Sequence, residues 1–204
     1  MSLHVAYRVY QLAAQLQLKR SQNHRLEELI HFLSIQKNDF EVLAKTYVLT
    51  GVSNRAGTRD LLQHMQNQQN IVCSLIMFDI DDFKDINDGH RHEVGDQVLQ
   101  NLTLLVKSLI RDTDHLARWG EEFIVLCLAT SLHNAMSLAN NLREKIASAV
   151  LSKDLTVICS FGLAQYHRNG NATIEKLFES ADKAMYTAKN AGQNRVEPQL
   201  DDIE

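Results

Sequence analysis

The chain has 204 residues, of which 45% are hydrophobic and 23% are charged, enough for one globular domain with a real core and a modest extension. One proline and eight glycines exclude collagen-like and low-complexity chains. The net charge of −4 provides no basic surface, so we expect no nucleic-acid partner; no apolar run reaches the ~18 residues of a membrane span.

Residues 4–47 are predicted to form a helix, because this segment lacks Pro and Gly and is rich in Leu, Gln, Ala and Glu. A heptad pattern runs through it and indicates a coiled coil, through which the chain would form a homodimer. The alternatives are a helix that packs back on its own domain, and two helices separated at residues 19–24. The heptad positions are Val9, Leu12, Leu16, Lys19, Asn23, Leu26, Ile30, Leu33, Lys37, Phe40, Ala44 and Tyr47.

The rest of the chain alternates between helical and strand patterns. Apolar residues at helical spacing predict helices over residues 57–68, 92–110, 135–150 and 174–190, the last ending at Gly192. Apolar runs predict strands over 71–78 and 155–164, a hairpin of 115–118 with 122–128, and a short strand at 195–197. The continuous run 71–78 is typical of a central strand covered on both faces. The pattern predicts an α/β (α+β) fold with a mixed central sheet flanked by helices.

Each of the three cysteines, Cys73, Cys127 and Cys159, lies in an apolar run, and no CxxC motif occurs. They are predicted to be small core residues in a reducing compartment. The N-terminus shows no secretory signal pattern, so we expect a cytoplasmic protein.

Two acidic clusters carry the candidate chemistry. Five of the ten residues in Asp79–Asp88 are Asp, and they follow the predicted central strand, where a loop is expected. The second cluster, Glu121 and Glu122, lies at the predicted hairpin turn. Hard oxygen ligands suit Mg²⁺ shared with a phosphate substrate, and a carboxylate there can accept a proton from an attacking hydroxyl. The alternatives are a solvated loop with helix caps and a hairpin tip charged for solubility.

Five motifs, in order, resemble the GGDEF domain of the diguanylate cyclase family over about residues 46–197. Asp79–Asp88 resembles D-x-D-x-F-K-x-x-N-D, Arg91–Asp96 resembles G-H-x-x-G-D, and Gly120–Phe123 resembles the signature hairpin. Ser160–Ala164 resembles S-x-G-x-A, and Ala181–Lys189 resembles A-D-x-A-(L/M)-Y-x-A-K. The resemblance implies a nucleotidyl-cyclase or palm-like fold.

The resemblance also implies a function. Two domains would face each other, each with one GTP, and condense the two GTP molecules into cyclic di-GMP with release of two pyrophosphates. Mg²⁺, with Mn²⁺ as an alternative, would be held by Asp79, the Ile80 carbonyl, Glu121 and Glu122, and Glu121 and Glu122 would be catalytic, with Glu121 accepting the proton. The GTP-binding residues would be Phe83, Lys84, Asn87, His92, Asp96, Gly120 and Lys189. Asn87 and Asp96 would bond the guanine edge, and Lys84 and Lys189 the phosphates.

A second site is implied by Arg111-Asp112-Thr113-Asp114, which resembles the family's R-x-x-D inhibitory motif at the family's spacing before the hairpin. Arg111 would bind a phosphate or guanine of the product, and Asp114 a guanine edge. Binding there would lower activity as cyclic di-GMP accumulates, which is feedback.

The chain departs from the family at four places. The signature has one glycine, Gly120, where the family has two: either one glycine is deleted, or Trp119 replaces the first. The spacing favours the deletion, which could re-register the hairpin so that Glu121 misses the metal. Arg91 stands at a family Gly, Tyr47 at a family Asp, and Gln193 at a family Arg; the last two changes would be related if those positions pair.

These changes leave two functional hypotheses. The first is an active, Mg²⁺-dependent, dimeric diguanylate cyclase, weakened by its shortened hairpin. The second is a degenerate domain that binds GTP or cyclic di-GMP as a signalling receptor without turnover. The expected organisation is a helical, coiled-coil signalling segment over residues 1–47, the GGDEF domain over 48–197 and a flexible tail over 198–204.

Overall fold

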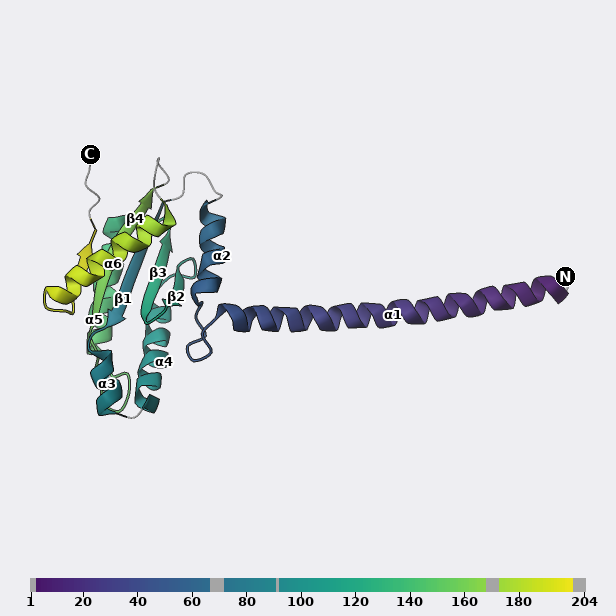
Figure 1. The fold of residues 1–204 in the computed structure, drawn as a ribbon, viewed down its shortest axis with the longest axis horizontal. Helices are drawn as coiled ribbons and strands as arrows, with labels where there is room; N and C mark the ends of the chain where they lie inside the picture. The colour runs from purple at the N-terminus through teal and green to yellow at the C-terminus, as the bar shows by residue number, and fades with distance from the viewer. Residues whose placement is uncertain (1–2, 67–71, 91, 168–172, 200–204) are drawn as a thin grey trace. The chain divides into compact units, whose positions relative to one another are not determined.

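The computed structural model describes residues 3–66, 72–90, 92–167 and 173–199 (Figure 1). The chain divides into two compact units, Met1–Ala44 and Lys45–Glu204. A search of the described helices finds none with the length and apolar character to cross a bilayer. The end of the predicted tail, residues 200–204, and Arg91 lie outside the described residues.

The first unit is part of one long helix, α1 (Leu3–Lys45), which confirms the predicted N-terminal helix except at its end, since Thr46 and the predicted heptad residue Tyr47 lie outside the helix. The helix continues through residues 19–24, so the alternative of two helices is wrong. Its large apolar side chains from Tyr7 to Leu43 are 47–74% exposed. Tertiary packing supplies most of the stability of a protein helix, and these exposed side chains leave an apolar surface that a partner helix could cover. The coiled coil and the homodimer stay predictions.

The second unit contains a five-stranded sheet in the order β2-β3-β1-β4-β5. Its strands are β1 (Val72–Ile80), β2 (His115–Trp119), β3 (Glu122–Leu128), β4 (Cys159–His167) and β5 (Val196–Pro198). All neighbours are antiparallel except β4 and β5, which are parallel. The sheet is therefore mixed, and β1, the continuously apolar run, is its central strand, as predicted.

Helices cover both faces of the sheet (Figure 1). One face packs on α4 (His92–Leu109) and α5 (Leu132–Ser148), and the other on α2 (Arg55–Gln66) and α6 (Ile174–Asn190). Successive β1 side chains alternate between the two cores, with Phe78 and Ile80 on the α4 face and Met77 on the α6 face. Asp79, between Phe78 and Ile80, therefore belongs to the α6 face.

In the second unit, one predicted strand boundary and one predicted loop are wrong. The strand expected from residue 155 begins only at Cys159, because Lys153 and Asp154 have positive φ and close a tight turn in which Ser152 pairs with Leu155. The loop expected after the central strand contains a short helix, α3 (Phe83–Gly89). Asp82, two residues after β1 ends, is the N-cap residue of α3 with a φ of 55°, and its carbonyl accepts hydrogen bonds from the amides of Asp85 and Ile86.

The core directly behind the end of β1 is aromatic. The ring of Phe78 stacks on Phe123 of β3 and Phe161 of β4, with centroid distances of 5.4 and 5.0 Å. All three rings are fully buried, and the two contacts follow the strand register. This stack fixes the three central strands against one another at the end of the sheet that carries Asp79.

The prediction that the three cysteines are core residues is confirmed, since Cys73, Cys127 and Cys159 are free and buried. Burial raises the pKa of the Cys73 thiol to about 12, which keeps it protonated and unreactive.

Candidate functional site

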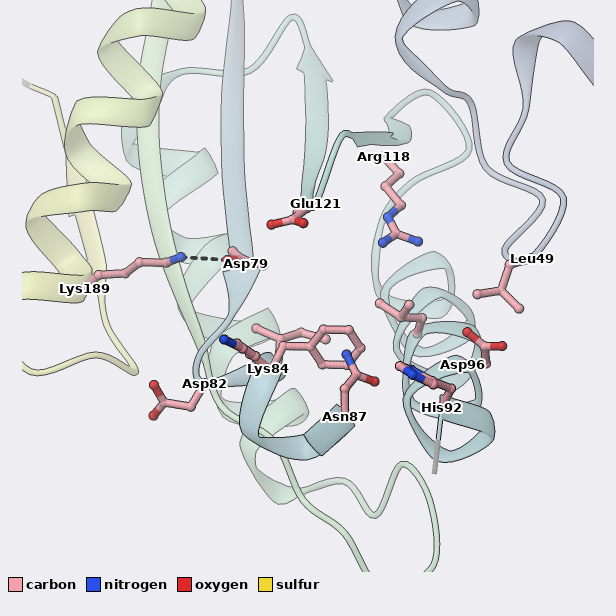
Figure 2. Close-up of a pocket in the computed structure, with 13 residues that line it drawn as sticks. Leu49, Asp79, Asp82, Lys84, Asn87, His92, Asp96, Arg118, Glu121 and Lys189 are labelled. Atoms are coloured by element: carbon pink, nitrogen blue, oxygen red, sulfur yellow. Dashed lines mark hydrogen bonds and ion pairs between the residues drawn. The ribbon is translucent and has the colours of Figure 1, made fainter. Parts of the chain in front are cut away.

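A pocket of about 630 Å³ lies at the C-terminal end of β1 (Figure 2). Its volume is that of a typical small-molecule site. Residues from β1, α3, α4, the hairpin and α6 contribute to it, so segments far apart in the sequence meet there. The predicted site residues that line it are Asp79, Ile80, Phe83, Lys84, Asn87, His92, Asp96, Glu121 and Lys189. Leu49, Asp82, Leu99 and Arg118 also line it and were not predicted as site residues.

Asp79 is held at the pocket by an ion pair with Lys189. The Lys189 Nζ lies 2.6 Å from Asp79 Oδ2, and the two side chains are 36% and 21% exposed. Burial alone would lower the pKa of Lys189, but the hydrogen bond and charge of Asp79, with Asp81 and Glu122, raise it overall. Lys189 therefore stays protonated and provides a fixed positive charge between acidic groups.

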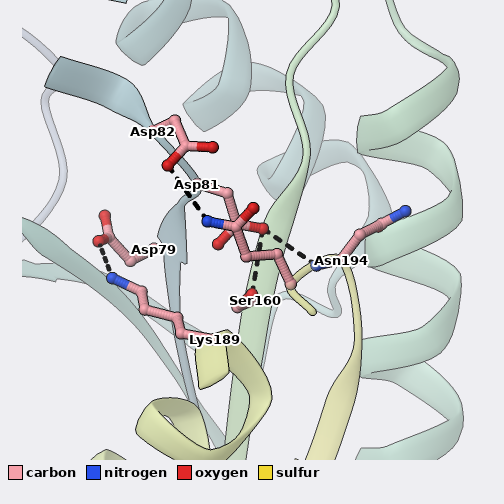
Figure 3. A network of polar contacts seen from close by, with 7 residues as sticks. Asp79, Asp81, Asp82, Ser160, Lys189 and Asn194 are labelled. Carbon is pink, nitrogen blue, oxygen red and sulfur yellow. Dashed lines mark hydrogen bonds and ion pairs between the residues drawn. The ribbon is translucent and has the colours of Figure 1, made fainter. Parts of the chain in front are cut away.

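Asp81 lies in the same acidic segment as Asp79, but it does not line the main pocket, and its side chain is hydrogen-bonded within the fold (Figure 3). Its side chain is buried, and its Oδ2 accepts hydrogen bonds from Ser160 Oγ at 3.0 Å and from the Asn194 amide at 3.1 Å. Burial raises the pKa of this carboxyl. Asp81 thus ties the end of β1 to β4 and to the loop that follows α6.

Gln193 belongs to that same loop. Its Nε2 donates a hydrogen bond to Asp82 Oδ1 at 3.2 Å (Figure 3). Tyr47 instead stacks its ring against the guanidinium of Arg118, with the Arg118 Cζ 5.2 Å from the ring centroid. In this chain the residues at these two positions have different partners, and the hypothesis that their changes are related stays a prediction.

The signature hairpin closes with a two-residue turn. Trp119 pairs with Glu122, and Gly120 at the first turn position has a φ of +86°. Glycine at that position is typical of a type II′ turn, which matches the twist of the strands. Phe123 keeps its register with Phe78, and Glu121 faces the pocket (Figure 2). With this one-glycine signature the hairpin pairs in register with β1, and Glu121 reaches the pocket.

The two adjacent glutamates point to different places. Glu121 lines the main pocket, while Glu122 lines a neighbouring hollow on the α6 side; Lys189 borders both. Gly120 is absent from the lining of the main pocket; a Cβ there would lie 3.2 Å from Arg55 Nη2 and 3.4 Å from Glu122 Oε2.

The comparisons with known proteins decide the family. A family model described as "Diguanylate cyclase, GGDEF domain" matches residues 44–195. The chain belongs to the GGDEF domain family.

Relatives of this GGDEF domain have more than one named activity. Diguanylate cyclase DgcM of Escherichia coli is 37% identical over 175 residues, which cover 82% of this chain and 42% of DgcM. Cyclic di-GMP phosphodiesterase NbdA of Pseudomonas aeruginosa is 31% identical over 194 residues, covering 90% of this chain and 24% of NbdA. The chain thus spans less than half the length of these curated relatives.

A solved structure shares the same architecture. The coiled coil and GGDEF domain of DgcB from Caulobacter crescentus, crystallised in complex with c-di-GMP, matches with a TM-score of 0.71 and 25% identity. The match covers 92% of this chain and 98% of that chain. It supports the predicted fold class, a GGDEF fold preceded by a long helix.

The oxygen donors of this GGDEF domain suit a hard divalent cation by type. Asp79, Ile80 and Glu121 all line the main pocket, and carboxylate and carbonyl oxygens are the ligands that Mg²⁺ prefers. Within the described ranges, no three His, Cys, Asp or Glu side chains are gathered closely enough to hold a metal ion. In the structure, the positive charge next to the Asp79 carboxylate is the ammonium group of Lys189.

The R-x-x-D residues form a separate pocket of about 380 Å³. Arg111 and Asp114 line it, and Asp114 Oδ2 accepts a hydrogen bond from the Arg111 amide at 3.0 Å. Asp114 Oδ1 is buried, and no residue that the structure describes donates a hydrogen bond to it. His115 also lines this pocket, and burial lowers the pKa of its imidazole. The pocket lies at the start of β2, whose other end carries the hairpin turn.

Proposed function

We propose that this GGDEF domain is a diguanylate cyclase that condenses two GTP molecules into cyclic di-GMP and two pyrophosphates, as a homodimer and with a divalent cation. The observation that supports this function best is the meeting of Asp79, Glu121 and Lys189 in one pocket with Asn87 and Asp96. Carboxylates and a lysine suit a triphosphate with its cation, while an amide and a carboxylate suit a guanine edge.

The reaction forms two P–O bonds and breaks two. In each half, the 3′-oxygen of one GTP attacks the α-phosphorus of the other, and the bond to the β-phosphate breaks to release pyrophosphate. Glu121, which enters the pocket from the hairpin turn, would accept the proton of the attacking hydroxyl. A bound Mg²⁺ would neutralise charge on the phosphates and would be held by Asp79, the Ile80 carbonyl and Glu121, which share the main pocket.

The charge and position of the other lining residues support the remaining proposed roles. Lys84 and Lys189 would bind the phosphates, and the N-terminus of α3 at Phe83 would direct backbone N–H groups toward them. Asn87 and Asp96, with His92 nearby, would bind the guanine on the α3–α4 side. Each domain would bind one GTP, and the reaction needs two. A second copy of the chain, joined through α1, would therefore supply the other GTP.

The test is a turnover assay with the purified chain, GTP and Mg²⁺ or Mn²⁺. We expect release of pyrophosphate and formation of cyclic di-GMP, with a rate per chain that rises with concentration as dimers form. Binding of GTP without any product at high protein concentration would reject the cyclase and support a receptor without turnover.

Replacing Gly95 by Ala should weaken GTP binding without unfolding the domain. A methyl group at Gly95 would collide with Asn87 Oδ1, and the flexible Asn87 side chain would rotate away from its place beside α4. Loss of a base contact should raise the Kd for GTP about tenfold, measured by calorimetry. Asn87→Ala should give the same Kd, and the double variant should be no weaker. An unchanged Kd in Gly95→Ala would remove Asn87 from the binding site.

Replacing Arg111 by Ala should relieve product inhibition. Loss of charge-assisted hydrogen bonds should raise the cyclic di-GMP concentration for half-inhibition by about thirtyfold. The measurement is the initial rate of pyrophosphate release at increasing cyclic di-GMP. Arg143→Ala on α5, away from this pocket, is the matched control. Equal inhibition in wild type and Arg111→Ala would reject the inhibitory site.

A further inference from the structure

The guanidinium of Arg118 holds the turn of the signature hairpin. Its Nε donates a hydrogen bond to the Gly120 carbonyl at 3.1 Å. Its Cζ lies 5.8 Å from the centroid of the Phe123 ring on the other strand of the hairpin. Arg118 also lines the main pocket beside Glu121 (Figure 2). The side chain thus contacts both strands and the first residue of a turn whose second residue is Glu121.

Tyr47 holds Arg118 from the segment that follows α1. The backbone of Tyr47 is fixed, because its amide donates to the Val52 carbonyl at 2.9 Å and its carbonyl accepts from the Gly51 amide at 2.7 Å. The same segment is bonded to β2, since the Arg118 amide donates to the Ser53 carbonyl at 2.8 Å. The ring of Tyr47 therefore meets the guanidinium, 5.2 Å away, from a fixed position.

The chemistry of this contact differs from that of an ion pair. The face of an aromatic ring attracts a guanidinium without supplying a negative charge. An Asp at position 47, the residue usual in the family, would place a carboxylate in this region. With Tyr47, the positive charge of Arg118 is oriented but not neutralised by residue 47, and it remains on the lining of a pocket that would receive a triphosphate nucleotide.

We propose that Tyr47 and Arg118 are positioning residues for the one-glycine hairpin: Tyr47 orients Arg118, and Arg118 holds the Gly120 carbonyl so that Glu121 faces the pocket. Tyr47 is absent from the pocket lining, so it acts through Arg118. The kinetic part of this inference rests on the proposed cyclase activity, and its structural part does not.

The test compares Tyr47→Leu, which removes the ring, with Tyr47→Phe, which keeps its face. Trp119, the only tryptophan of the chain, precedes Gly120 and reports on the hairpin by fluorescence. We expect acrylamide to quench Trp119 about twofold more effectively in Tyr47→Leu, with kcat lowered about tenfold and KM changed less than twofold. Tyr47→Phe should match wild type in quenching and in kcat.

A double-mutant cycle tests whether Tyr47 acts on the hairpin through Arg118. Arg118→Met should loosen the hairpin as Tyr47→Leu does, and adding Tyr47→Leu to it should change quenching no further. Arg118→Lys, which keeps the charge but lacks Nε, should also show the higher quenching. This variant and circular dichroism melts keep the test valid if Tyr47→Leu folds poorly.

Two results would overturn the inference: equal quenching in Tyr47→Leu and Tyr47→Phe, or fully additive effects of Tyr47→Leu and Arg118→Met. A wild-type chain that makes no cyclic di-GMP would reject the proposed function instead. The comparison of Trp119 quenching between Tyr47→Leu and Tyr47→Phe tests the positioning role whether or not the chain makes cyclic di-GMP.

Discussion

Asp79→Asn should lower the rate of cyclic di-GMP formation by about a thousandfold while leaving the fold intact. The substitution keeps the shape of the side chain but removes the charge that Lys189 meets at 2.6 Å and that a divalent cation would need. Both partners are partly exposed, and exposed ion pairs contribute only about 0–1 kcal/mol to stability. The catalytic loss should therefore far exceed any loss of stability. The measurements are initial rates of pyrophosphate release and a thermal melt.

Asp88→Asn is the matched control for that experiment. Asp88 belongs to the same acidic segment, is exposed, and is not among the residues that line the main pocket. It should retain the wild-type rate. Equal rates in wild type and Asp79→Asn would show that this carboxylate takes no part in the reaction, and the proposed cation site would have to be abandoned.

Gly162→Ala should lower the free energy of unfolding by about 3 kcal/mol, and Tm by about 10 °C. Gly162 lies on β4 between Met77 of β1 and Glu197 of β5, and helix α6 crosses directly over it. A Cβ there would overlap the Ala181 carbonyl oxygen and the Met185 amide nitrogen. These are backbone atoms, so the helix itself would have to move. Differential scanning calorimetry measures the change.

The control adds a methyl group where the chain leaves space for it. A Cβ on Gly89, at the end of α3, meets no atom of the described residues within 4 Å, so Gly89→Ala should shift Tm by less than about 2 °C. Because α6 also carries Lys189, Gly162→Ala should in addition weaken GTP binding. An unchanged Tm in Gly162→Ala would show that α6 does not need this close approach.

Periodicity predicted the parts of the fold in which burial determines the sequence pattern. The apolar run of β1 is covered on both faces, and the predicted helix over residues 174–190 matches α6. It failed where local backbone geometry dominates. Residues 155–158 look like strand, yet Lys153 and Asp154 form a turn before them. Helix α3 has no buried residue, so it leaves no apolar pattern.

The candidate site, like the fold, was predicted from the sequence only in part. Motif spacing selected residues that the structure brings into one pocket, such as Asp79, Asn87 and Glu121. Spacing could not separate Glu121 from Glu122, because the turn geometry sends the second carboxylate to the α6 side. Arg118 was missed, although its alternation with the buried Leu116 on β2 indicates which face of the sheet it shares.

The three stacked phenylalanines each adjoin a polar residue near the site: Phe78 precedes Asp79, Phe123 follows Glu122, and Phe161 follows Ser160. A slip of one residue in any of these strands would move a ring to the opposite face of the sheet and a polar or charged group into the aromatic layer. Insertions and deletions are thus tolerated only outside the aromatic layer, in the connections. We expect natural variants of this chain to differ in hairpin length and loop composition, while the spacing between rings and neighbouring polar groups stays constant.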